Sequence, residues 1–150
     1  MAIKQVADRL TAHLSRIPAR YHQFSEEELL RRPAPGKWSK KEILGHLCDS
    51  ALNNLKRFED IQCLPQPYTV VGYKQDALMA INRYQELPLE HVLQLWKTLN
   101  QQIVYVISSI PANKLHYTVL LASGESYTLE WLVEDYIEHM DHHWKQVFGA

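Results

Sequence analysis

Apolar side chains recur every three or four residues along four long segments of the chain, which is the spacing that places them on one face of an α-helix. The clearest pattern lies between Leu89 and Ile110, where apolar positions alternate in steps of four and three. The spacing predicts four main helices, near residues 2–17, 40–60, 89–110 and 128–147. The first is expected to end before Pro18. Four amphipathic helices joined by short extra helices and loops favour an all-α four-helix bundle.

Capping signals support these boundaries. Ser39 with Glu42, three residues later, forms a capping-box pattern just before the second long helix, and Ser25 with Glu28 forms another before a short helix. Residues 62–72 contain two prolines and no sustained period, so they predict a long loop. Ordered loops of that length often cover functional sites.

The last predicted helix carries three histidines within five residues. His139 and His143 are four apart, so they share one face and could bind one metal ion from successive turns. They continue a stripe through Leu132 and Tyr136 that should face the core. His142 belongs to a charged stripe and is expected to point to solvent. Because a three-residue spacing also keeps side chains close, His142 remains an alternative to His143 as a ligand.

A mainly polar stripe runs beside the apolar stripe of the 40–60 helix. Its members are Ile43, His46, Ser50, Asn53 and Arg57. Such a ridge either faces solvent or lines a cavity inside the bundle, and periodicity does not choose between the two. If it lines a cavity, His46 is the natural partner for His139 and His143. Three neutral imidazoles leave a coordination position open for water or substrate, as in catalytic zinc sites.

Composition limits the classes of function. The 150 residues are 46% hydrophobic and 22% charged, which suits a single domain over 1–150. The net charge of -1 and the lack of a basic segment predict no nucleic-acid partner. The apolar runs are too short to span a membrane and the first residues lack a secretory pattern, so a cytoplasmic protein is expected. Cys48 and Cys63 fit no paired metal spacing and are expected to be reduced thiols.

Three parts of the sequence together resemble the DinB/YfiT-like superfamily of metal-dependent enzymes, also described as the DinB-like domain. They are PAPGKWSKKEILGHLCDS, the following Asn53 and Arg57, and the late segment ESYTLEWLVEDYIEHMDHHWKQV. In that family a histidine in the pattern W-S-x-x-E-x-x-x-H and a late H-x-x-x-H pair bind a divalent metal within a four-helix bundle. Matched residue by residue, the implied ligands are His46, His139 and His143.

The resemblance implies zinc or nickel, a homodimer, and a small-molecule substrate. In some branches of the family it also implies transfer or isomerisation with a low-molecular-weight thiol, while many members are described as hydrolases. The first hypothesis is therefore a metal-dependent thiol S-transferase or hydrolase. Arg57 and Asn53, inferred from position alone, are its expected catalytic residues and would orient an anionic substrate.

A second hypothesis is a non-enzymatic bundle that binds a metal for structural reasons, or binds a small molecule. It is motivated by the lack of an evident general base: the sequence has no H-E-x-x-H motif, and Glu138 lies on the predicted solvent face. A structural site should lose thermal stability on chelation with little effect on activity, whereas a catalytic site should lose activity first.

Overall fold

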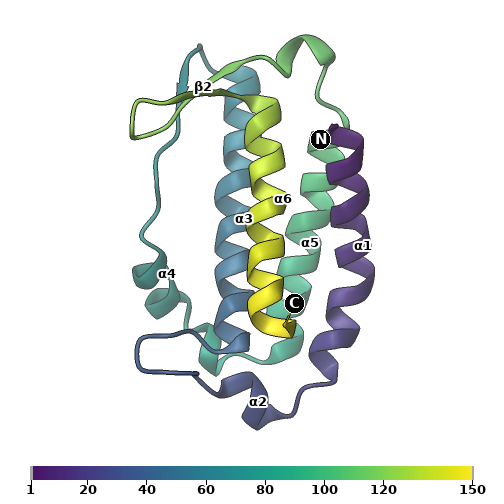
Figure 1. Ribbon diagram of the computed structural model, residues 1–150, viewed down its shortest axis with the longest axis vertical. Helices are drawn as coiled ribbons and strands as arrows, with labels where there is room; N and C mark the ends of the chain where they lie inside the picture. Colours follow the sequence, from purple (N-terminus) through teal and green to yellow (C-terminus); the bar gives the residue numbers. More distant parts are fainter. Residues whose placement is uncertain (1, 150) are drawn as a thin grey trace.

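Four long helices run side by side in the computed structural model, which describes residues 2–149 (Figure 1). They are α1 (Ile3–His22), α3 (Lys40–Cys63), α5 (Leu89–Ser108) and α6 (Leu129–Phe148). The predicted all-α four-helix bundle is therefore confirmed. Their buried apolar residues form one hydrophobic cluster, to which all four helices contribute.

The first helix is longer than the sequence predicted. It continues through Pro18 to His22 instead of ending before the proline. A proline within a helix removes one N–H donor and crowds the preceding turn, at a cost of about 3 kcal/mol. Tyr21 holds the last turn in place: it is fully buried, its ring packs edge-on against Trp144, and its hydroxyl donates to the Lys40 carbonyl at 2.8 Å. The prediction was wrong because this tertiary contact leaves no local signal.

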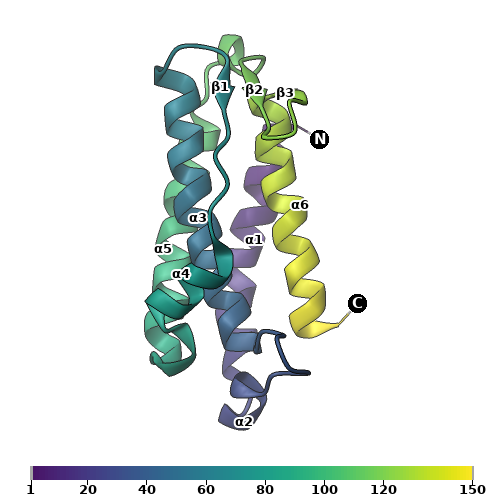
Figure 2. The same ribbon diagram turned by 90° about the vertical axis from the view of Figure 1, so that its left-hand side faces the viewer.

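Shorter elements connect the long helices. They are α2 (Glu26–Leu30), α4 (Gln75–Asn82), the 3-10 helices η1 (Tyr84–Glu86) and η2 (Ala112–Lys114), and the strands β1 (Tyr68–Thr69), β2 (Thr118–Leu120) and β3 (Ser126–Thr128). β2 pairs in parallel with β1 and antiparallel with β3. This small sheet lies at one end of the bundle and joins the loop after α3 to the start of α6 (Figure 2).

The predicted capping box fixes the start of α3. The Ser39 hydroxyl accepts from the Glu42 N–H at 3.1 Å, and the Glu42 carboxylate accepts from the Ser39 N–H at 3.0 Å. Arg32 donates to the same carboxylate at 2.8 Å. With the first turn held in this way, His46 lies about two turns into the helix.

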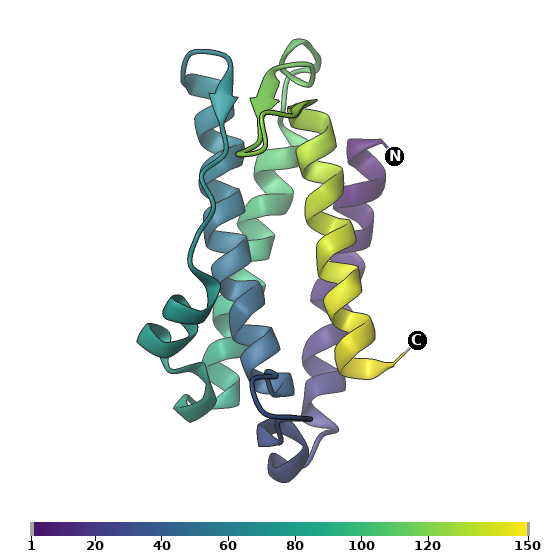
Figure 3. The ribbon, with the colours of Figure 1, turned by 60° about the vertical axis from the view of Figure 1, so that its left-hand side comes forward.

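The segment after α3 turns back along the bundle. It runs beside α3 toward α4, which packs on the outer side of that helix (Figure 3). The long loop predicted over residues 62–72 therefore contains β1 and then passes along the face of α3 that carries the polar ridge. No helix within residues 2–149 combines the length and the apolar character needed to cross a membrane.

Candidate metal centre

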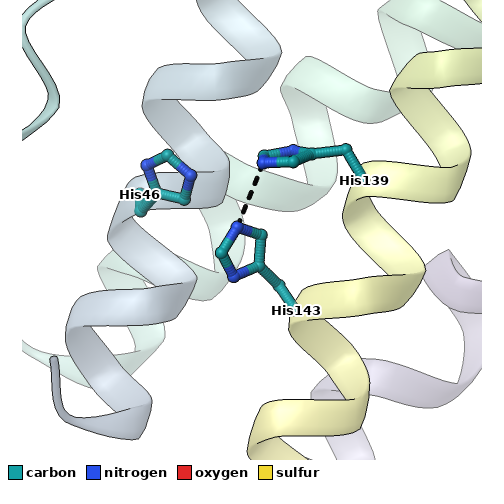
Figure 4. Close-up of side chains that lie close together, drawn as sticks. All are labelled: His46, His139 and His143. Atoms are coloured by element: carbon teal, nitrogen blue, oxygen red, sulfur yellow. Dashed lines mark hydrogen bonds between the residues drawn. The ribbon is translucent and has the colours of Figure 1, made fainter. Parts of the chain in front are cut away.

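Three histidines from two helices meet inside the bundle. His46 comes from α3, and His139 and His143 come from successive turns of α6 (Figure 4). The Nε2 atoms of His139 and His143 are 3.2 Å apart, and the His46 ring centroid lies 4.8 Å from that of His143 and 5.7 Å from that of His139. Each of the three histidines offers one ring nitrogen, and these three nitrogens all lie within 4.8 Å of one another.

The helical register separates the two adjacent histidines of α6. His143 is 9% exposed and belongs to the cluster, whereas His142 is exposed and lies outside it. A step of four residues from His139 to His143 returns to nearly the same face of the helix. His142, one residue before His143, is rotated about 100° away from His143 around the helix axis. The apolar and charged stripes of the sequence thus predicted correctly that His143 faces inward and His142 faces solvent.

Burial keeps the three imidazoles in the neutral form. Removal from water lowers the pKa of His46 to about 3, and the nearby His143 and His139 act in the same direction. Burial also lowers the pKa values of His139 and His143. A neutral imidazole has a lone pair available for a metal, so the environment favours the protonation state that coordination needs.

Hydrogen bonds set the tautomer of His143. Its Nδ1 lies 2.8 Å from Oε1 of Gln146, an acceptor, so Nδ1 carries the proton and Nε2 keeps its lone pair. His46 differs: its ring centroid lies 4.7 Å from that of Trp38, with the two ring planes tilted by 35°, and its buried Nδ1 has no hydrogen-bond partner among the residues described. Trp38 thus covers a ligand candidate, a contact that the sequence did not indicate.

The donor set fits a divalent metal ion. Nitrogen ligands of a tetrahedral zinc ion lie roughly 3.3 Å from one another, given bonds of about 2.0–2.1 Å. The separation of 3.2 Å between His139 and His143 matches this value, while His46 would have to move closer. Three neutral nitrogen donors suit zinc and nickel better than magnesium or calcium, which prefer oxygen.

A pocket of about 260 Å³ adjoins the histidine cluster. Its walls come from α3, the loop before α4, the start of α4, and α6. The lining residues are Ser50, Asn54, Arg57, Gly72, Tyr73, Gln75, Leu132, Asp135, Tyr136 and His139. Because His139 belongs to both the cluster and the pocket, a molecule in the pocket would lie next to a bound ion. Two members of the polar ridge of α3, Ser50 and Arg57, line this pocket, so part of the ridge faces a cavity, which is one of the two alternatives that the sequence left open.

Arg57 is held at the wall of this pocket by its neighbours. One guanidinium nitrogen donates to the Val71 carbonyl at 2.7 Å and another contacts the Asn54 side-chain oxygen at 3.4 Å. The guanidinium also lies 5.7 Å from the centroid of the Tyr73 ring. A guanidinium has five N–H donors, so these contacts leave donors available for an anionic group.

The structure places Asn53 outside the pocket lining. Its side-chain amide donates to the Asp49 carbonyl of its own helix at 2.8 Å. Asn54 lines the pocket instead and is buried, with its amide donating to the Ser50 carbonyl at 2.8 Å. Steps of three and of four residues from Ser50 are both compatible with one helical face, so the sequence could not distinguish the two asparagines. Tyr73 carried no sequence signal beyond its place after a loop.

The family profile of the DinB superfamily matches residues 2–147 of the sequence. The chain belongs to the DinB superfamily. This DinB-superfamily protein is 25% identical over 134 residues to BH0277 of Halalkalibacterium halodurans, which is named as a candidate metal-dependent hydrolase. The match covers 87% of the chain and 77% of BH0277.

Two solved structures share the fold of this DinB-superfamily protein. One is YfiT from Bacillus subtilis, described as a probable metal-dependent hydrolase with an unusual four-helix bundle topology. It superposes with a TM-score of 0.81 at 19% identity, over 95% of this chain and 80% of YfiT. The other is the mycothiol-dependent maleylpyruvate isomerase, with a TM-score of 0.70 at 11% identity. The chain is covered to 98% in that match but spans 60% of the isomerase chain.

Proposed function

We propose that this DinB-superfamily protein is a metal-dependent enzyme that acts on a small anionic molecule, as a thiol-dependent S-transferase or as a hydrolase. His46, His139 and His143 would hold a divalent ion, either zinc or nickel. The observation that carries the proposal is the shared position of His139, which belongs to the buried histidine cluster and also lines the adjoining pocket. A structural metal site would need no such opening.

Each part of the pocket has a proposed task. A bound divalent ion would supply Lewis acidity that lowers the pKa of a coordinated thiol or water. Arg57 would hold an anionic group of the substrate, because its guanidinium is fixed by Val71 and suits carboxylates or phosphates. For the neighbouring amide we favour Asn54 over Asn53, since Asn54 lines the pocket. Asp135 adds a carboxylate at the pocket, and burial raises its pKa.

The relatives support both reaction types. A candidate hydrolase is related over most of the chain, and a thiol-dependent isomerase has the same fold. The thiol, the choice of zinc or nickel, and a homodimer come from the family resemblance. The cytoplasmic location is expected from the sequence alone.

The function is tested by assaying metal-reconstituted protein for thiol transfer and for hydrolysis of carboxylate-bearing substrates. We expect one activity to disappear when a chelator removes the metal and to return on addition of Zn²⁺ or Ni²⁺. Loss of thermal stability on chelation, with no metal-dependent activity in either assay, would instead identify a structural metal and favour the non-enzymatic hypothesis.

Arg57→Met is expected to raise KM for an anionic substrate by about 10- to 100-fold, since hydrogen bonds to charged groups contribute about 1.5–3 kcal/mol. Arg57→Lys should give a smaller increase because the charge remains. Lys56→Met is the matched control: the Lys56 side chain is 70% exposed and pairs with Asp60, away from the pocket. Equal KM values for Arg57→Met and the wild type would remove Arg57 from substrate binding.

A further inference from the structure

Two buried polar atoms lie one helical turn apart on α3, and neither has a hydrogen-bond partner within residues 2–149. They are Nδ1 of His46 and Oδ2 of Asp49. Both side chains are more than nine-tenths buried, with exposures of 1% and 5%. A buried polar atom without a partner costs about 1–3 kcal/mol, so such atoms in a native protein usually have a purpose. One of these atoms is a potential donor and the other is an acceptor.

The orientation of His46 leaves Nδ1 free for a second contact. Figure 4 shows that its Nε2 turns toward His139 and His143 while Nδ1 points away from them. If Nε2 coordinates a metal, Nδ1 must carry the proton. Metal-bound histidines almost always donate this second N–H to a carboxylate, a carbonyl or water. His143 already has such a contact with Gln146, whereas His46 has none.

Asp49 is held in place from its other side. Its Oδ1 accepts from the Tyr84 hydroxyl at 2.6 Å and from the Asn82 side-chain amide at 3.1 Å. The Tyr84 ring packs so closely over Gly45 that no Cβ would fit there. Two donors on one oxygen fix the carboxylate and leave Oδ2 as the atom with unused acceptor capacity.

We propose that Asp49 is a positioning residue for the metal ligand His46, with Oδ2 accepting the Nδ1–H hydrogen bond of the imidazole in the metal-bound protein. The inference rests on the proposed metal centre. The structure has no hydrogen bond between these two atoms, so a rotation of the imidazole or of the carboxylate would have to accompany coordination. The contact fixes the tautomer that presents Nε2 to the ion and raises the basicity of the ligand.

The alternative is that Asp49 only anchors Tyr84 and the segment around α4. In that case Asp49→Asn would lower stability without changing metal binding. Tyr21→Phe is the matched control, because it removes a buried hydrogen bond to α3, at Lys40, without touching His46 or Asp49.

Zinc affinity is measured by competition with a chromophoric chelator for the wild type and both variants. We expect Asp49→Asn to weaken zinc binding by about 10- to 100-fold, and Tyr21→Phe to leave it within about threefold. If Asp49→Asn binds zinc as tightly as Tyr21→Phe, the positioning role is wrong while the metal centre stands. If the wild type itself binds no zinc or nickel, the proposed function fails first.

Nitrogen NMR of histidine-labelled, zinc-loaded wild type provides a readout that does not depend on the variant folding. A His46 proton on Nδ1, with a chemical shift that marks a hydrogen bond to a carboxylate, supports the proposal. A proton on Nε2, with Nδ1 as the metal ligand, overturns it.

Discussion

His143→Ala is expected to lower the affinity for a divalent metal ion by more than about 100-fold, whereas His142→Ala leaves it within about threefold of the wild type. The two histidines are adjacent in sequence but differ in direction. His143 is 9% exposed and its Nε2 lies 3.2 Å from that of His139, while His142 is exposed. Removal of one of three ligands should exceed the 10- to 100-fold effect typical of residues that only support a ligand.

Titration of both purified variants with zinc against a competing chelator measures this difference. His142→Ala serves as the control, since it removes an imidazole from the same helical turn and leaves all three histidines of the cluster in place. Equal losses for both variants, or a larger loss for His142→Ala, would show that α6 presents a different face to the metal.

The metal-free protein is expected to lose about 2 kcal/mol of stability between pH 7 and pH 5 from His46 alone. In the folded protein the pKa of His46 lies at about 3, below its ordinary value of 6.5, because the side chain is buried beside His143 and His139. The unfolded state therefore binds more protons between these two values, and stability falls as the pH drops below about 6.5. His139 and His143, whose pKa values are also lowered, add to the loss.

Urea unfolding of chelator-treated protein at pH 7 and pH 5 measures the change. His46→Gln provides the comparison, because it removes one titrating group and should flatten the pH dependence by about the same 2 kcal/mol. If the free energy of unfolding changes equally with pH in the wild type and in His46→Gln, His46 is not held neutral in the folded protein. Addition of zinc at pH 7 should raise the stability of the wild type more than that of His46→Gln.

The sequence predicted the four-helix architecture because helical periodicity and capping are local signals. The capping box at Ser39 and the apolar spacing between Leu89 and Ile110 each operate within a few turns. The errors occurred where distant contacts decide the structure. α1 passes through Pro18 because Tyr21 packs on α6, and the small sheet forms only because β1 pairs with β2, a strand far from it in the sequence.

The candidate site was predictable to the same extent. The spacing of four predicted that His139 and His143 lie together, and the polar stripe of the 40–60 helix, supported by the family resemblance, indicated His46 as their partner from another helix. The residues of the pocket wall were harder to predict from the sequence, because steps of three and of four residues do not decide which of two adjacent asparagines on α3 faces the pocket. Trp38, Tyr73 and Tyr84 reach the site through loop and turn conformations that periodicity does not encode.

Elemental analysis of protein purified from zinc- and nickel-supplemented cultures, wild type beside His46→Ala, tests the metal centre most directly. We predict about one divalent ion per wild-type chain and little metal in His46→Ala, because the ion needs a ligand from α3 as well as the pair from α6. A wild-type protein without metal, or His46→Ala with the same metal content as the wild type, would contradict the proposed centre.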